Sequence, residues 1–336
     1  MSSESEKVSK ASAPGNLFFL GEHAVVEGVP AIVAAVGLRA RVLARLTQSS
    51  AVEVDSSFYG TESARLGEEK NLEHASIPLR PLLRLLKQVA ESASKKVGMK
   101  ATIESEIPPE CGLSSSSATL CALLAASAPL VDLRINPDDF YEWLYPYQVE
   151  IHGGKASGAE IASTAFGGVH RVQKVVEQTT TLLRRKLDIK PLRIVVGDTL
   201  VRSPTREVTG RYMRELQEKE PALVERSFAR IAALVDIAER AIIEDDLPVL
   251  GECMNENQRI LRDELGVSHL VLDRLVEVTL QAGALGAKLS GAGRGGVMFA
   301  LTTGVTQPAI AEAIEKAGGK AIMVELGGPG IEATCE

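Results

Sequence analysis

The sequence is poor in cysteine and in aromatic residues. Its 336 residues include four cysteines, which lack the CxxC spacing of a zinc site and are too sparse for a disulfide framework: Cys111, Cys121, Cys253 and Cys335. Aromatic residues make up 4% of the chain, which is too few for a row of base-stacking platforms. We therefore expect a protein of a reducing, cytoplasmic setting without a cysteine zinc site.

The sequence also lacks an excess of positive charge and long hydrophobic runs. Lys and Arg number 37 against 44 Asp and Glu, so the formal net charge is −7 and no basic field attracts nucleic acid or anionic lipid. The longest apolar stretches, residues 31–36 and 118–131, are shorter than the roughly 18 residues that cross a membrane. Neither nucleic acid nor a membrane is an expected partner.

The chain does contain enough apolar sequence for one large core or two ordinary ones, being 45% hydrophobic and 24% charged. Residues 1–9 are polar and are predicted to form a flexible leader. We place a first domain at residues 10–187 and a second at residues 188–336. Short β-branched runs between Gly and Pro predict strands within residues 16–47, whereas residues 205–263 have helical periodicity.

Four further stretches have recognisable patterns. Apolar residues at helical spacing predict a helix within residues 78–96, and residues 99–107 alternate as a strand. Residues 173–190 are polar and predict an edge hairpin or a connector. Residues 296–326 predict a strand, a helix and a final strand.

A glycine-serine loop, "PPECGLSSSS", leads directly into the apolar helix predicted at residues 118–131. Backbone N–H groups and the helix dipole converge at such an N-terminus and favour an anion. Ser114, Ser115, Ser116 and Ser117 add hydroxyls that can cap the helix, bind phosphate oxygens or ligate Mg²⁺. Capping alone needs one serine, so the run of four favours phosphate binding.

A second loop, "GAKLSGAGRGG", holds five glycines ahead of a strand, and this predicts close approach of the backbone to a ligand. The loop is not a Walker A motif, because GxxxxGK[ST] occurs nowhere in the sequence, and its position ahead of the strand argues against a dinucleotide fingerprint. A third stretch, "SAPGNLFFLGEHAVVEG", places Glu22 and His23 in a turn between apolar runs. Charged residues there need a partner or a ligand, and the pair alone is compatible with either.

In this order and spacing, the three loops resemble the GHMP small-molecule kinases, and most closely the mevalonate kinases of that family. "HGGKASGAEIASTAFGG", "IVVGDT", "SPTRE" and "MNENQRILRDELGVS" resemble stretches of archaeal and eukaryotic mevalonate kinases in the expected order. The resemblance covers at least residues 10–301. It implies an α+β fold of two domains, with an N-terminal α/β domain, a C-terminal ferredoxin-like α+β domain and the active site in the cleft between them.

The resemblance also implies an activity: ATP and Mg²⁺ would be used to convert mevalonate to 5-phosphomevalonate in isoprenoid biosynthesis. The residues that match the acceptor-binding positions are Glu22, His23 and Thr205. Those that match the nucleotide-binding positions are Pro109, Gly112, Leu113, Ser114, Ser115, Ser116, Ser117, Gly291, Gly293 and Arg294.

Two positions of chemical importance depart from the family pattern. Asn16 stands where mevalonate kinases have a catalytic Lys, and Glu160 stands where they have the Asp proposed as base. Glu160 can still accept the alcohol proton, although its extra methylene displaces the carboxylate. Lys155 is a candidate to supply the missing charge, or it faces solvent.

The predicted metal ligands are Ser116 and Glu150. The family's Mg²⁺-binding Glu lies four positions before the His-Gly pair, which here is Gln148, but an extra glycine in "HGGK" can shift the register towards Glu150. Arg294 replaces a family glycine, and it is either a cation for the ATP phosphates or a solvent-facing residue.

Two other readings stay open at this point. The altered pair of residues can mark a different acceptor, either the 3-hydroxyl of mevalonate or an already phosphorylated mevalonate, for which Arg202, Arg206 and Lys155 are available cations. Alternatively, the chain binds ATP and mevalonate without turnover, as a sensor. A homodimer is compatible with the sequence but is not indicated by it.

Overall fold

Two long antiparallel strands form the spine of the molecule: β1 (Val8–Leu20) and β2 (Ala31–Thr47). They arise from the first alternating apolar runs, and their register shifts between Pro14 and Gly15 and between Phe18 and Leu20. Such bulges bend a strand and redirect its side chains. The computed structural model describes residues 7–68, 72–94, 97–203 and 205–335.

The strands of the described residues belong to one twelve-stranded sheet, with the path β4-β3-β5-β2-β11-β8-β10-β9. The strands besides β1 and β2 are β3 (Ala51–Ser56), β4 (Gly60–Arg65), β5 (Gly98–Ser105), β6 (Val169–Val176), β7 (Thr180–Leu187), β8 (Leu192–Asp198), β9 (Gly286–Ser290), β10 (Val297–Leu301), β11 (Lys320–Leu326) and β12 (Glu332–Cys335). In this part of the chain β7 pairs only with β6, so of the two alternatives predicted for residues 173–190 the structure has the edge hairpin.

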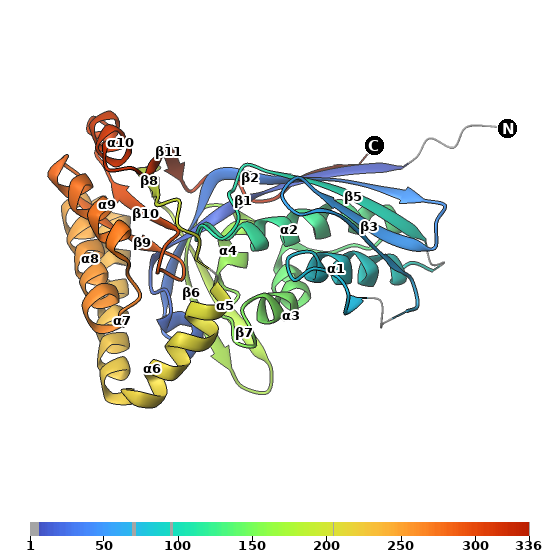
Figure 1. The fold of residues 1–336 in the computed structure, drawn as a ribbon, viewed down its shortest axis with the longest axis horizontal. Coiled ribbons are helices and arrows are strands. Elements are labelled where there is room, and N and C mark those ends of the chain that lie inside the picture. Colours follow the sequence, from blue (N-terminus) through green and yellow to red (C-terminus); the bar gives the residue numbers. More distant parts are fainter. Residues whose placement is uncertain (1–6, 69–71, 95–96, 204, 336) are drawn as a thin grey trace.

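Four helices lie against one face of the N-terminal part of this sheet (Figure 1): α1 (Arg80–Glu91), α2 (Ser115–Ser127), α3 (Phe140–Ile151) and α4 (Ala159–Phe166). The apolar face of α1 is buried, as its leucine spacing predicts. Helix α2 is buried along most of its length and contacts β1 and β2, so the predicted central helix is confirmed.

The C-terminal half has the order β11-β8-β10-β9, and all neighbours in it are antiparallel. Numbered from β8 onwards, the strands follow the order 4-1-3-2, which is the ferredoxin-like arrangement that the family resemblance implies. Its helices gather at the far end of the molecule (Figure 1). They are α7 (Pro221–Glu244), α8 (Leu247–Arg259), α9 (Leu270–Gln281) and α10 (Gln307–Lys316).

A helical segment connects β8 to these helices and comprises α5 (Thr205–Glu207), a wider turn at Val208–Tyr212 and α6 (Met213–Lys219). The final strand β12 then returns to the other end of the molecule and pairs with β1 from Ser9 to Ser12. The C-terminal end of the chain therefore returns to the part of the molecule formed by residues before the predicted boundary near residue 187. That boundary stays a prediction, and residues 1–6 of the predicted leader lie outside the described residues.

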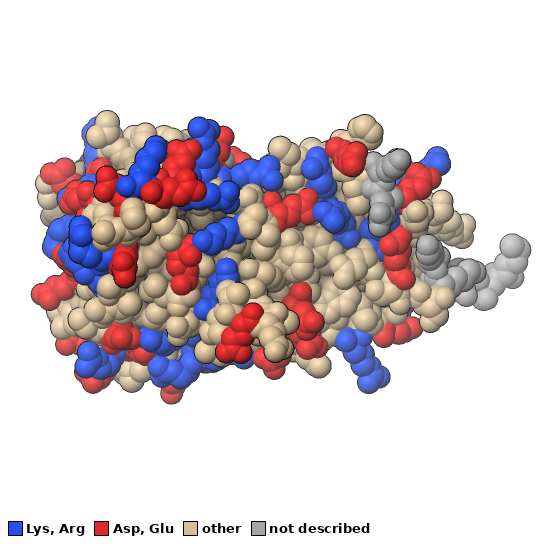
Figure 2. All heavy atoms as spheres, turned by 90° about the horizontal axis from the view of Figure 1, so that it is seen from below, with Lys and Arg blue, Asp and Glu red and all other residues tan. Residues whose placement is uncertain are grey.

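Charges of both signs are interspersed over the face of the molecule shown in Figure 2, and an uncharged area extends across its middle. Within the described residues, no helix is long and apolar enough to cross a membrane.

Candidate active site

A cavity of about 420 Å³ brings together the loops that the sequence analysis selected. Its wall includes Glu22 and His23 after β1, the glycine-serine loop before α2, the connection from α3 to α4, residues of α5, and Gly291. The sequence-predicted residues in this wall are Glu22, His23, Pro109, Gly112, Ser114, Ser115, Ser116, Ser117, Glu160, Thr205 and Gly291.

The glycine-serine loop turns through left-handed backbone at Gly112 (φ 89°) and Ser114 (φ 55°), and α2 begins at Ser115. The Ser114 side chain does not cap the helix. Because the first N–H groups of a helix have no intrahelical partner, this end of α2 presents donors to the cavity. The local geometry therefore suits an anion such as a phosphate.

The two glycine loops touch each other. A Cβ atom on Gly112 would lie 2.5 Å from the carbonyl oxygen of Ser290, and one on Gly291 would lie 2.8 Å from the Cα of Gly112. The hydroxyl of Ser290 accepts a hydrogen bond from the N–H of Phe18 at 3.1 Å. Close contact between strand β1, the loop before α2 and the loop after β9 thus requires glycine at both positions.

Glu22 and Lys288 form a buried ion pair behind the cavity wall. Their side chains are 2% and 0% exposed, and Lys288 Nζ donates to Glu22 Oε1. Burial raises the pKa of Glu22 while the Lys288 ammonium opposes this, and burial lowers the pKa of Lys288. Glu22 Oε2 is buried and has no partner among the described residues, so it remains available to a hydroxyl of a ligand.

His23 occupies left-handed backbone (φ 63°), which is unusual for a residue with a side chain. Its Nε2 lies 3.1 Å from the carbonyl oxygen of Ala292, in the second glycine loop. Burial lowers the pKa of His23 to about 4, so the imidazole is neutral at physiological pH. In the described part of the chain its Nδ1 has no partner.

Glu160 lies in the first turn of α4, is 3% exposed and contributes to the cavity wall. His152, which the sequence analysis did not select, also lines the cavity, with its Nε2 3.8 Å from Glu160 Oε1. Burial lowers the pKa of His152, whereas the Glu160 carboxylate opposes this. The turn before α4 is fixed by Tyr141 and Tyr145, whose hydroxyls donate to the carbonyls of Ser157 (3.0 Å) and Ala156 (3.3 Å).

Asn16 is fully buried and is not part of the cavity wall. Its side-chain oxygen accepts a hydrogen bond from Ser163 on α4, and its side-chain nitrogen donates to Ser114 Oγ at 3.3 Å. Its backbone N–H donates to the carbonyl of Leu113, which is itself buried behind the wall. Asn16 thus connects the helix that carries Glu160 to the glycine-serine loop.

Several predicted site residues are not brought to the cavity. Lys155 pairs with Glu27 and faces a separate small pocket. Arg294 is exposed and stacks on Tyr212, 3.6 Å from the ring centroid, and Gly293 packs on Val267. These positions correct the expectation that Lys155 and Arg294 supply cations to the reacting groups.

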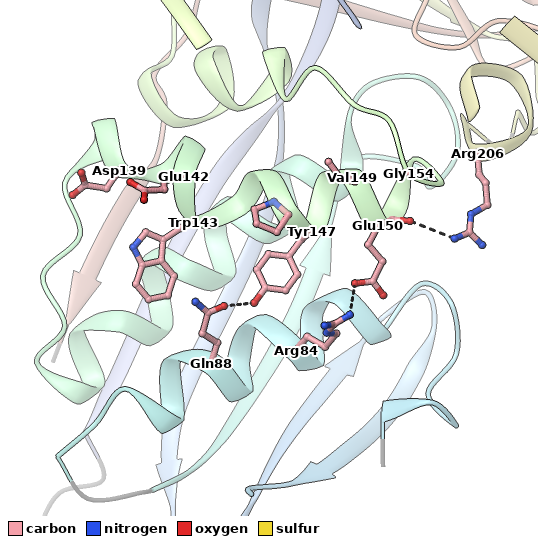
Figure 3. A pocket seen from close by; sticks show the side chains of 11 residues that line it. Arg84, Gln88, Asp139, Glu142, Trp143, Tyr147, Val149, Glu150, Gly154 and Arg206 are labelled. Carbon is pink, nitrogen blue, oxygen red and sulfur yellow. Dashed lines mark hydrogen bonds and ion pairs between the residues drawn. The ribbon is translucent and has the colours of Figure 1, made fainter. Parts of the chain in front are cut away.

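Glu150 is also directed away from the cavity. Its carboxylate pairs with Arg84 at 3.0 Å in an adjacent groove of about 820 Å³ (Figure 3). Gln148 instead points towards the glycine-serine loop, because its Nε2 donates to Ser117 Oγ at 2.9 Å. Two residues along a helix correspond to a rotation of about 200°, so Gln148 and Glu150 cannot share a face.

The residues around the serines of α2 offer oxygen ligands that fit a magnesium ion. No group of three or more His, Cys, Asp or Glu side chains suited to a metal occurs in the described ranges. Ser116 and Ser117 line the cavity, and the buried Oε1 of Gln148 has no partner within the described structure. Such oxygen ligands fit Mg²⁺ that is held largely by nucleotide phosphates and water, whereas Glu150 does not fit.

Comparison with known proteins decides the family. A family model described as the GHMP kinases N terminal domain matches residues 81–168, and one described as GHMP kinases C terminal matches residues 238–320. A mevalonate kinase of Pyrococcus abyssi is 33% identical over 334 residues, covering 96% of this chain and 96% of that protein. The chain is a GHMP kinase.

A second curated relative, the mevalonate kinase of Aeropyrum pernix, is 33% identical over 303 residues, covering 88% of this chain and 89% of that protein. Among solved structures, L. major mevalonate kinase in complex with R-mevalonate has a TM-score of 0.76 at 22% identity, covering 94% of this chain and 95% of that one. The Methanococcus jannaschii mevalonate kinase has a TM-score of 0.77 at 20% identity, covering 97% and 99%. This GHMP kinase therefore has the two-domain family fold, and its family implies ATP as co-substrate.

The contact between the glycine loops can be tested with Gly112→Ala. Gly318 is a matched control, since its φ of +91° resembles the +89° of Gly112 but nothing lies within 4 Å of its Cβ position. Gly318→Ala carries only the backbone penalty, whereas Gly112→Ala should lose a further 1–3 kcal/mol, roughly, from the clash. Urea unfolding measures both, and equal losses would contradict the contact.

The buried ion pair predicts that Lys288→Met greatly lowers the free energy of unfolding. The change leaves the Glu22 carboxylate buried without its partner, which costs about 3–5 kcal/mol of unfolding free energy. Lys316→Met, which removes an exposed pair with Glu312, should leave stability unchanged within error. A small loss for Lys288→Met in urea unfolding would show that Glu22 does not depend on this pair.

His23 predicts a loss of stability in acid. The unfolded imidazole titrates near its ordinary pKa of 6.5, whereas the folded one titrates near 4, so unfolding takes up a proton between these values. The contribution of His23 to the free energy of unfolding is fully present above pH 6.5. It declines as the pH falls and is lower by about 2 kcal/mol at pH 5. His23→Gln should reduce the difference between urea unfolding at pH 7 and pH 5 by this amount; an unchanged difference would show that His23 titrates normally.

Proposed function

We propose that this GHMP kinase transfers the γ-phosphoryl group of ATP to a hydroxyl of mevalonate, forming 5-phosphomevalonate and ADP. The observation that carries the proposal is the meeting of an anion-binding helix N-terminus and a buried carboxylate, Glu160, in one cavity wall. Mevalonate kinases as relatives across nearly the whole chain support the acceptor.

The cavity has an apolar part and a polar part, which suit the two ends of a nucleotide. Phe58, Tyr59, Ile77 and Leu82 line the apolar part, which would receive the base. The triphosphate would lie at the N-terminus of α2, on Ser114–Ser117, with Gly291 and Ala292 close to it from the other half of the molecule.

The acceptor would lie between Glu22, His23 and Glu160. The partnerless Oε2 of Glu22 and Nδ1 of His23 can bind its polar groups, and Thr205 lines the same wall. The acceptor hydroxyl oxygen would bond to the γ-phosphorus as the bond from that phosphorus to the β-γ bridging oxygen of ATP breaks. ADP leaves with that oxygen, and the hydroxyl proton passes to Glu160.

A magnesium ion bound to the nucleotide would neutralise the charge that accumulates on the phosphates. Ser116, Ser117 and the amide oxygen of Gln148 are the groups of this chain that would hold it. Asn16 would contribute indirectly, because its hydrogen bonds to Ser163 and Ser114 hold the glycine-serine loop in position against α4, the helix that carries Glu160.

Glu160→Gln tests the assigned base. The amide cannot accept the proton, so kcat with mevalonate should fall by about 10²- to 10⁴-fold while the KM for ATP stays within a few-fold. Glu142→Gln is the control, because Glu142 lines the adjacent groove rather than the cavity. ADP release measures both variants.

Retention of full activity in Glu160→Gln would overturn its role as base. An inactive wild-type enzyme that still binds ATP and mevalonate by calorimetry would support the sensor instead of the kinase.

A further inference from the structure

The cations near the cavity are nearly all neutralised by carboxylates. Lys288 pairs with Glu22, Lys155 with Glu27, and Arg202 with Asp198 at 3.5 Å. Arg84 pairs with Glu150 in the groove. These contacts remove Arg202 and Lys155 from the set of cations that could receive an anionic acceptor.

Arg206 on α5 differs from all of them, because it lines the cavity and has no ion pair within the described residues. Its Nη2 donates one long hydrogen bond, 3.4 Å, to the backbone carbonyl of Glu150 (Figure 3). The guanidinium carries five N–H donors, so most of its capacity is unused by that contact.

The stem of Arg206 is held in place by the turn that leads to Glu160. A Cβ atom on Gly153 would lie 2.8 Å from Cγ of Arg206, so the arginine packs directly on this glycine. On the following helical turn, a Cβ on Gly210 would lie 2.7 Å from the carbonyl oxygen of His152. Arg206 is exposed and lines both the cavity and the adjacent groove, so a packed stem carries its guanidinium where the two meet.

We infer that Arg206 binds the carboxylate of the acceptor, and that the site selects a singly charged hydroxy acid over its phosphorylated form. The inference rests on the proposed function. A planar guanidinium matches a carboxylate with two parallel hydrogen bonds.

The charge of the cavity wall limits how much negative charge the acceptor can carry. Four glutamates line it, whereas Arg206 is the one Arg or Lys side chain there among the described residues; the glutamates are Glu22, Glu110, Glu160 and Glu207. The N-terminus of α2 is occupied by the nucleotide in the proposed function. A phosphate ester would bring about two further negative charges without a cation to receive them.

The test compares two acceptors of the same carbon skeleton: mevalonate and 3-methylpentane-1,3,5-triol, in which a neutral CH₂OH group replaces the carboxylate. Arg206→Gln should lower kcat/KM for mevalonate by about 10- to 100-fold and leave that for the triol within about threefold. The kcat/KM of Arg206→Lys for mevalonate should lie between those of the wild type and Arg206→Gln, because lysine keeps the charge but loses the planar fork of the guanidinium. Arg84→Gln, on the other side of Glu150, is the matched control and should change neither.

Calorimetric titration of mevalonate into the wild type and Arg206→Gln, with Mg·ADP present, gives a second measurement that needs no turnover. The dissociation constant should rise by the same 10- to 100-fold. Equal losses for both acceptors, no loss for either, or efficient use of 5-phosphomevalonate by the wild type would overturn the inference. A wild type that phosphorylates no acceptor, but whose mevalonate binding still depends on Arg206, would reject the proposed function and retain the inference.

Discussion

The contact between the two glycine loops is the constraint on which the rest of the site depends. Gly112 and Gly291 belong to different halves of the chain, and the space between them admits no Cβ atom on either. This contact sets the N-terminus of α2 opposite the loop after β9, and Ala292 in that loop holds His23 through its carbonyl. The geometry of the cavity thus follows from backbone packing before any catalytic side chain is considered.

The contacts around Asn16 and the pairing of the nearby cations explain how the chain accommodates Asn16 in place of the Lys of the family pattern. Asn16, at the Lys position of the family pattern, is satisfied at both ends of its amide and connects α4 to the glycine-serine loop. The cations nearby are directed to carboxylates of the protein, with Arg206 as the exception at the cavity wall. Replacement of Lys therefore leaves a wall rich in carboxylates, in which magnesium and the helix dipole would balance the nucleotide charge.

Much of this arrangement could be predicted from the sequence, because motifs report local backbone. The glycine-serine loop, the second glycine loop and Glu22–His23 all reach the cavity, and the buried α2 and the β6–β7 hairpin were recognisable from their patterns. The ferredoxin-like order of the C-terminal strands followed from family resemblance, not from periodicity.

The remaining site residues could not be predicted because their contacts link distant parts of the chain. Lys155 meets Glu27, 128 positions away, and Arg294 stacks on Tyr212. Whether Gln148 or Glu150 faces the serines depends on the phase of α3, which an extra glycine after the helix leaves undetermined in the sequence. A lysine within the short strand before the second glycine loop is a local indication that Lys288 has a special role. Its partner Glu22 could not be predicted, because it lies 266 positions away.

The measurement that tests the account most directly is ³¹P NMR of the product formed by the wild-type protein from Mg·ATP and mevalonate. Transfer to the 5-hydroxyl should give the signal of a primary phosphate ester at the 5-position, appearing with equimolar ADP and absent without mevalonate. A tertiary ester at the 3-position, or no ester despite binding of both ligands, would contradict it.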